Sequence, residues 1–171
     1  FFFDGKTVFE TTTIQQILQL FSKTELQNLV SGAFGSSIGS NSDVSLLLDN
    51  ILSNVSQNDA FFLPKFSIIP IAQLRGHLGG YKKMSQEIFI SNSLIKRCID
   101  DSFISGLFVC VVLEEFGHHL EQLCFEAASV STTDTVGDEG SAFGMAILSK
   151  ASEKLLTGDI DWELTIDAFK L

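Results

Sequence analysis

The residues best suited to chemistry in this sequence are carboxylates and imidazoles that directly follow an apolar run at 103–113. A run this apolar predicts a buried helix, whose continuation carries the polar side chains into or beside the core. Glu114 and His118 are four residues apart, so a helix places them on one face, about one turn from each other. Because an unpaired buried carboxylate is costly, we expect these side chains to pair, to form hydrogen bonds or to hold a metal ion.

The same spacing occurs in the zinc-peptidase helix motif His-Glu-x-x-His, here with glutamate in place of the first histidine. In that motif the first and last residues bind the metal, and the second residue is the general base that activates the attacking water. Glu114 and His118 are therefore candidate ligands, and Glu115 is the candidate catalytic base. A second register pairs Glu115 with His119 and makes His119 an alternative ligand. The competing interpretation is an exposed polar helix end after a buried start.

A second carboxylate cluster lies in the polar segment 129–140, which contains Asp134, Asp138 and Glu139. We expect a loop here, followed by a helix over about 138–156. Asp138 and Glu139 then lie at the helix N-terminus, where capping and the helix dipole favour carboxylates even without a metal.

The elements that must position these residues are read from apolar periodicity. Helical spacing predicts helices over about 14–22, 24–30, 43–55, 92–98 and 102–127, with Asp43 as the cap of the third and loops at 31–42 and 129–140. Alternation and β-branched residues predict strands over about 1–10, 61–69, 86–91 and 161–171, with a turn at 71–74. Prolines in and after 61–69 place that strand near a sheet edge.

The predicted fold class is α+β, a small mixed or antiparallel sheet packed on the long central helix, with an N-terminal helical layer. The chain reads as one domain, 1–171, with the helical part at 1–60 and the site-bearing core at 61–171. The glycine-rich segment 75–81 reads as a loop. Its His77 is a further candidate ligand, although a loop histidine without a metal is the commoner case.

Composition narrows the function classes. The net charge of −10 gives the chain little attraction for nucleic-acid phosphates or anionic lipids. No apolar run reaches about 18 residues, so we expect no transmembrane segment. The odd number and wide spacing of Cys98, Cys110 and Cys124 argue against a disulfide scaffold, and we expect reduced, buried thiols. The chain starts at Phe1 without a signal peptide, so we expect a processed product or a domain of a larger protein.

Two motifs, in order and at a similar distance, resemble a module of large bacterial secreted proteins. The first is Leu-Glu-Glu-Phe-Gly-His at 113–118, and the second is Asp-Thr-Val-Gly-Asp-Glu-Gly at 134–140, followed by Phe143. Upstream of them, Gly80-Tyr81 and the strand Glu87-Ile88-Phe89-Ile90-Ser91 also resemble that module. The resemblance covers about residues 61–171.

The layout of this module resembles a minimal zincin metallopeptidase. The resemblance implies zinc as the cofactor, a peptide or protein as the substrate, and a secreted or toxin-type parent protein. It implies that Glu87 to Ser91 form an edge strand that binds the extended substrate backbone. It also implies a third ligand from the later helix, a role that Glu139 matches best, with Asp138 or Asp134 as alternatives. The departure from the zincin pattern is Glu114, where zincins have histidine.

The sequence thus predicts a zincin-like metallohydrolase with Glu114, His118 and Glu139 as ligands and Glu115 as the base. Two carboxylates and a neutral imidazole balance a divalent cation, whereas without a cation one carboxylate would have its pKa raised. An acid pair as in glycoside hydrolysis is an alternative that leaves His118 without a role. Two rivals are a non-catalytic interaction or structural domain with a buried polar network, and a module stabilised by calcium or another cation, although calcium prefers oxygen ligands.

Overall fold

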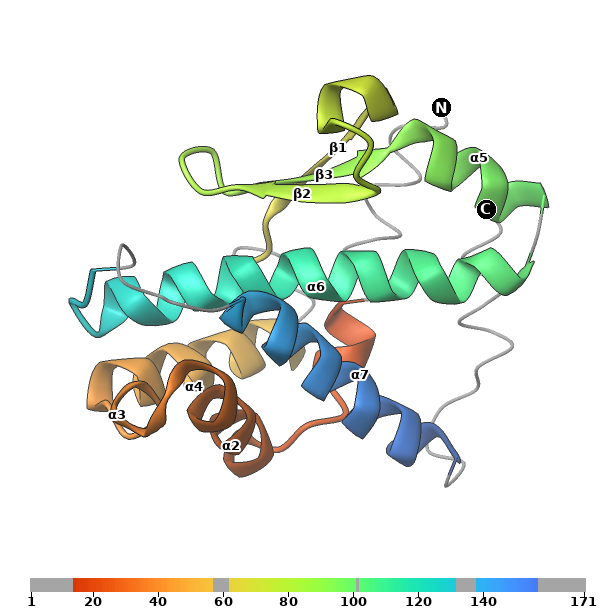
Figure 1. Cartoon of the computed structure of the whole chain (residues 1–171). Helices are drawn as coiled ribbons and strands as arrows, with labels where there is room; N and C mark the ends of the chain where they lie inside the picture. The colour runs from red at the N-terminus through yellow and green to blue at the C-terminus, as the bar shows by residue number, and fades with distance from the viewer. Residues whose placement is uncertain (1–13, 57–61, 101, 132–137, 157–171) are drawn as a thin grey trace.

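The computed structural model describes residues 14–56, 62–100, 102–131 and 138–156 of the chain. It has an α+β fold in which the long helix α6 (Ser102–Ala127) lies between a small sheet and a group of helices (Figure 1). The predicted fold class and central helix are confirmed. Because α6 is covered on two sides, its apolar residues occur around the helix axis and not on a single stripe.

The helices on one side of α6 come mainly from the first part of the chain. They are α2 (Lys23–Phe34), α3 (Ser36–Gly39) and α4 (Ser42–Ser56), preceded by helical residues at 14–18. Their buried side chains include Leu26, Val30, Val44, Leu48 and Ile51. These residues recur at spacings of three and four, so each helix turns one apolar face to the core, as predicted.

The loop predicted at 31–42 is wrong, because α2 continues to Phe34 and α3 follows almost at once. Phe34 and Ile38 are buried, and their packing offsets the low helix propensity of the neighbouring glycines and serines. The predicted cap of α4 is also wrong. The Asn41 side-chain oxygen accepts the Asp43 N–H at 2.9 Å, so Asn41 caps the helix and Asp43 lies in its first turn.

The sheet on the other side of α6 is mixed and has the strand order β1-β3-β2. β1 (Lys65–Ile69) runs parallel to the central strand β3 (Glu87–Ser91), and β2 (Gly79–Lys82) runs antiparallel to it. Ile88 and Ile90 of β3 are fully buried, since alternate residues of a strand point to the same face. The edge position predicted for β1 from its prolines is confirmed.

Two predictions about this region are wrong. The segment 75–81 is not wholly a loop, because Gly79 and Gly80 pair with β3 in spite of the low strand propensity of glycine. β3, which the resemblance implies is an edge strand, is central and has a neighbour on each side, and β2 takes the edge nearer α6 (Figure 1). The turn predicted at 71–74 is the 3-10 helix η1 (Ile71–Leu74).

Two further helices flank α6 in sequence, α5 (Asn92–Asp100) and α7 (Glu139–Leu156). The end of α6 and the start of α7 lie within a residue of their predicted positions. Phe143 of α7 is fully buried and stacks on an aromatic ring of α2, which ties α7 to the N-terminal layer. The strands predicted over 1–10 and 161–171 lie outside the described residues.

The thiols of Cys110 and Cys124 are free, as expected. Cys124 is fully buried, and burial raises the pKa of its thiol to about 12, whereas Cys110 is half-buried. The side chain of Cys98 lies outside the described residues. Within the described part of the chain, no helix is long and apolar enough to cross a membrane.

Candidate metal centre

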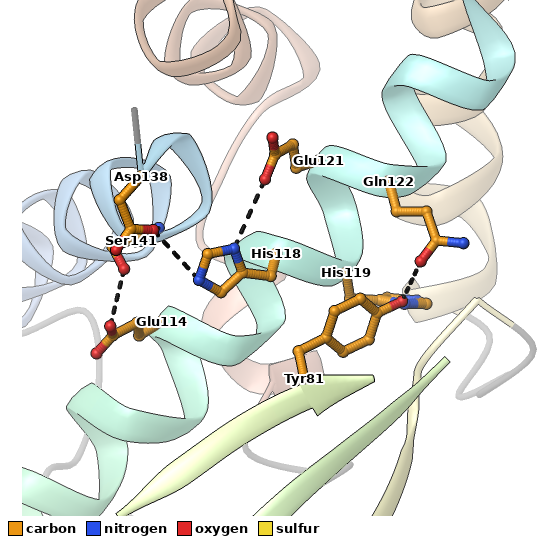
Figure 2. Close-up of polar contacts among 8 residues, drawn as sticks. All are labelled: Tyr81, Glu114, His118, His119, Glu121, Gln122, Asp138 and Ser141. Carbon is orange, nitrogen blue, oxygen red and sulfur yellow. Dashed lines mark hydrogen bonds and ion pairs between the residues drawn. The ribbon is translucent and has the colours of Figure 1, made fainter. Parts of the chain in front are cut away.

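The middle of α6 and the start of α7 bring together Glu114, His118 and Asp138. One ligand atom of each residue lies within 4.8 Å of the ligand atoms of the other two. Glu114 and His118 are half-buried on one face of α6, as their spacing predicts, and Asp138 is exposed just before α7 (Figure 2). Two carboxylates and one imidazole are a donor set that zinc binds in proteins.

Glycines allow α7 to lie directly against this face of α6. A Cβ atom added to Gly117 would overlap the carbonyl oxygen of Gly140, and one added to Gly144 would lie 2.6 Å from the carbonyl oxygen of Leu113. Larger residues at these positions would push the helices apart. Gly117, Gly140 and Gly144 therefore set the distance between the ligands on α6 and the start of α7.

Hydrogen bonds hold the carboxylates of the cluster in place. Asp138 Oδ1 accepts the Ser141 N–H at 3.2 Å, which is the helix-capping contact expected from its position. The Ser141 hydroxyl donates to Glu114 Oε1 at 2.8 Å, and His118 Nε2 lies 3.3 Å from Asp138 Oδ1. Ser141 was not anticipated from the sequence, because its hydroxyl bonds to Glu114 on another helix and no local pattern signals that contact.

Glu139, which the resemblance favours as the third ligand, is not part of this group. Successive residues at a helix start point about 100° apart, so only one of Asp138 and Glu139 can face His118, and it is Asp138. Glu139 Oε2 is buried, and it has no hydrogen-bond partner among the described residues. Its charge lies close enough to Glu121 to raise the pKa of that carboxyl, an effect smaller than burial.

Glu115, the candidate base, is buried beside the cluster and next to the sheet. A Cβ atom on Gly79 of β2 would lie 3.3 Å from Glu115 Oε1, so this carboxylate lies between α6 and the edge strand. The side chain is 9% exposed, and within the described part of the chain it has no hydrogen-bond partner. Burial, and then the charges of Glu114 and Asp138, raise the pKa of Glu115 to about 7.

His119 faces the sheet and not the cluster. Its Nε2 lies 2.9 Å from the Phe62 carbonyl oxygen, and its Nδ1 lies 2.9 Å from the Tyr81 hydroxyl, which donates to Gln122 Oε1. The ring is almost fully buried, and burial lowers the pKa of His119. Through Tyr81, His119 connects β2 to α6 (Figure 2). Through the Phe62 carbonyl oxygen, it also connects the segment before β1 to α6.

The other predicted site residues are not in the cluster. His77 is exposed in the turn before β2, and Asp134 lies outside the described residues. Residues 87–91 form the central strand, whose backbone groups pair with both neighbouring strands.

No known protein family, curated protein or solved structure matches this chain. The function must therefore be inferred from the geometry of the cluster. One feature fits a bound cation: the carboxylates of Glu114 and Asp138 lie together with a ring nitrogen of His118.

Proposed function

We propose that this chain is a zinc-dependent hydrolase that acts on peptides, with Glu114, His118 and Asp138 as the metal ligands. The observation that carries the proposal is the convergence of these three ligand atoms, from α6 and from the residue just before α7, within 4.8 Å. Bound there, zinc would supply a Lewis acid that lowers the pKa of water and polarises a carbonyl group.

Glu115 is the proposed general base. It lies one residue from Glu114 on the helix, so it is offset from the ligand face but remains near the cluster, as the influence of Glu114 and Asp138 on its pKa indicates. A pKa of about 7 suits a group that must accept a proton near neutral pH. No hydrogen bond to a described residue ties up its oxygens, so they can accept a proton from water.

The edge strand β2 is the proposed site for an extended peptide backbone, in place of β3. β2 is an edge strand of the described sheet, and its Gly79 lies against the Glu115 side chain of α6. A strand edge binds an extended peptide through backbone hydrogen bonds, and glycine lets the peptide come close. The reacting carbonyl would then lie beside the base and the cluster. The secreted, toxin-type parent protein stays a prediction from the resemblance.

The test is cleavage of an unbiased peptide library, read by mass spectrometry, with the zinc-loaded parent protein and the Glu115→Gln variant. The variant keeps the side-chain shape and loses the base, so we expect it to bind zinc like the parent and to cleave about 100-fold more slowly or worse. A parent protein that cleaves nothing beyond what the variant cleaves would contradict the proposed activity.

A non-catalytic, cation-stabilised domain is the second candidate. Two hydrogen bonds of Ser141 favour it. The Ser141 hydroxyl donates to a carboxylate oxygen of Glu114, and the Ser141 N–H donates to one of Asp138. These bonds give both carboxylates a structural role that needs no catalysis. This candidate predicts zinc binding and a higher melting temperature with zinc, together with no cleavage in the same library experiment.

A further inference from the structure

The exposed charges are distributed unevenly between the two layers that cover α6. Residues 62–97 form the sheet, η1 and most of α5, which lie on one side of α6 (Figure 1). They contain six of the 11 lysines and arginines of the chain and only one of its 21 aspartates and glutamates. The six basic residues are all exposed: Lys65, Arg75, Lys82, Lys83, Lys96 and Arg97. The sheet side of this acidic protein therefore has a basic surface, which the net charge of −10 conceals.

Within the described residues, none of these six basic side chains forms an ion pair. Glu87, the acidic residue of this segment, lies opposite Lys65 and Lys82 in the sheet register. Its carboxylate oxygens accept hydrogen bonds from the hydroxyls of Ser67 and Ser85. The positive charges of the sheet layer are therefore available to another molecule.

Two of these cations, Lys82 and Lys83, lie where the edge strand β2 ends. Tyr81 contacts His119 of α6, and side chains alternate along a strand, so Lys82 points to the face of the sheet away from α6. Lys83 follows at the start of the turn to β3. Burial raises the pKa of Glu121 on α6, and the charge of Lys83 opposes that rise, so Lys83 lies near α6. The end of β2 therefore carries two positive charges.

The other end of β2 lies beside the proposed base. Gly79 lies against the Glu115 side chain, and a strand rises about 3.3 Å per residue, so Lys82 is about 10 Å further along the strand. A peptide that pairs with this edge and places its reacting carbonyl beside Glu115 would have the third residue from that carbonyl opposite Lys82. The charges of Glu114, Glu115 and Asp138 disfavour a carboxylate at the cleaved bond itself. Attraction of an acidic residue is therefore confined to the lysine end of β2.

The net charge decides which kind of anionic partner fits this end of β2. A membrane or a nucleic acid extends over much of the protein surface and meets the overall charge of −10, which repels it. A short peptide lies within about 8 Å of the lysines, the distance over which salt screens charges, so it experiences mainly their attraction. An acidic peptide is therefore the partner that the charge distribution favours.

We propose that the substrate peptide carries aspartate or glutamate about three residues from the cleaved bond, where Lys82 and Lys83 bind it. The proposal rests on the proposed hydrolase function, because both use the edge of β2 as the peptide site. One exposed ion pair changes affinity by a few-fold, so two lysines should give a preference of about three- to tenfold.

The first test is peptide binding, which needs neither zinc nor cleavage. The probe is a short fluorescein-labelled peptide, rich in threonine and valine, with glutamates at one end, and a matched peptide has glutamines there. Fluorescence anisotropy with the metal-free parent should show about three- to tenfold tighter binding of the glutamate peptide. The difference should shrink at high salt, because salt screens exposed charges.

Two double variants locate the preference. Lys82→Gln with Lys83→Gln should bind both peptides alike. Lys96→Gln with Arg97→Gln removes the same charge from α5 in the same layer, and this control should keep the preference. All four residues are exposed, so we expect both variants to fold, which thermal unfolding checks. No preference in the parent, or an equal loss in both variants, would overturn the proposal.

Anionic vesicles that contain phosphatidylserine test the other partner. Binding of these vesicles by the parent, lost in the Lys82 and Lys83 double variant and without a preference between the peptides, would overturn the proposal in favour of a membrane surface.

Cleavage of the peptide library by the zinc-loaded parent gives the second readout. The cleaved sequences should be enriched in aspartate or glutamate about three residues from the cleaved bond, and the Lys82 and Lys83 double variant should lose this enrichment. Cleavage without the enrichment would overturn the proposal and leave the hydrolase function standing. A preference in binding without any cleavage would overturn the hydrolase function and leave the recognition of acidic peptides standing.

Discussion

His118 and His119 are neighbours on one helix, and the structure gives them opposite surroundings. His118 is half-buried and faces two carboxylates, that of Asp138 just before α7 and that of Glu121 one turn further along α6. His119 is almost fully buried and faces the carbonyl group of Phe62 and the hydroxyl group of Tyr81. The first environment suits a metal ligand, and the second suits a structural contact between helix and sheet.

The difference teaches that spacing alone could not choose between the two registers. Each histidine follows a glutamate by four residues, and a helix places both pairs on a common face. The choice depends on which layer covers which face. The layer that contains a helix N-terminus and carboxylates covers Glu114 and His118, and the sheet covers Glu115 and His119.

Replacing each of the two histidines by glutamine gives the largest expected difference in zinc affinity. His118→Gln should weaken zinc binding on the order of 100-fold or more, because a site with three protein ligands loses one of them. His119→Gln should leave zinc affinity within a few-fold of the parent and lower the stability of the metal-free protein by about 1–3 kcal/mol, since buried partners lose their hydrogen bonds. Both are measured by isothermal titration and thermal unfolding. A large loss of zinc affinity in His119→Gln would mean that the sheet side binds the metal.

Replacing Glu115 by glutamine should reveal the raised pKa of Glu115 through the pH dependence of protein stability. The folded protein holds the Glu115 proton up to a pKa of about 7, above the ordinary value of 4.5, so the ionised group destabilises the fold. The parent should therefore lose stability relative to the variant as pH rises from about 4.5 to above 7, by about 3 kcal/mol at the plateau. Below pH 4.5 this difference should vanish.

Urea unfolding of the metal-free proteins across that pH range checks this prediction. Zinc should reduce the gap, because a nearby cation stabilises the ionised carboxylate. A gap that is independent of pH would show that folding does not shift the pKa of Glu115.

Gly144→Ala should disturb the His118 side through the helix contact alone. The added methyl group meets the backbone of α6 at Leu113 and Glu114, so we expect a loss of about 1–3 kcal/mol in stability together with weaker zinc binding. Gly32→Ala is the matched control, since nothing lies within 4 Å of the added atom in α2, and it should stabilise the protein by about 0.5–1 kcal/mol. Equal stability of the two variants would mean that α7 lies further from α6.

Tyr81→Phe gives the smallest expected loss of stability. It changes only the contacts between His119, α6 and the sheet. It removes the hydroxyl that contacts His119 and donates to Gln122, so thermal unfolding should show a loss of about 1 kcal/mol. Zinc affinity should not change. A tenfold loss of affinity would contradict the separation of the two faces of α6.

The sequence was most informative where the signal is local. The extent of α6, the start of α7 and the common face of Glu114 and His118 follow from apolar periodicity and from helix geometry. The strand at β3 was also predicted from alternation. In each case neighbouring residues along the chain contain the information.

The remaining features depend on contacts between distant segments. β2 was missed because Gly79 and Gly80 have no alternating pattern, and only pairing with β3 makes them a strand. Whether Asp138 or Glu139 faces α6 depends on the residue at which α7 begins and on the glycine contact between the helices. The resemblance pointed to Asp138 and Glu139 and favoured Glu139, whereas the structure brings Asp138 within 4.8 Å of Glu114 and His118.

Zinc titration of the metal-free parent, Asp138→Asn and Glu139→Gln tests most directly whether Glu114, His118 and Asp138 form a metal site. Glu114 and His118 are common to all three proteins, so the comparison isolates the third ligand. We expect the parent to bind about one zinc ion per chain at neutral pH, with a higher melting temperature as a consequence. Asp138→Asn should bind at least about tenfold more weakly, since it loses a charged ligand, and Glu139→Gln should bind like the parent. A parent protein that takes up no zinc, or a loss of affinity confined to Glu139→Gln, would contradict the assignment.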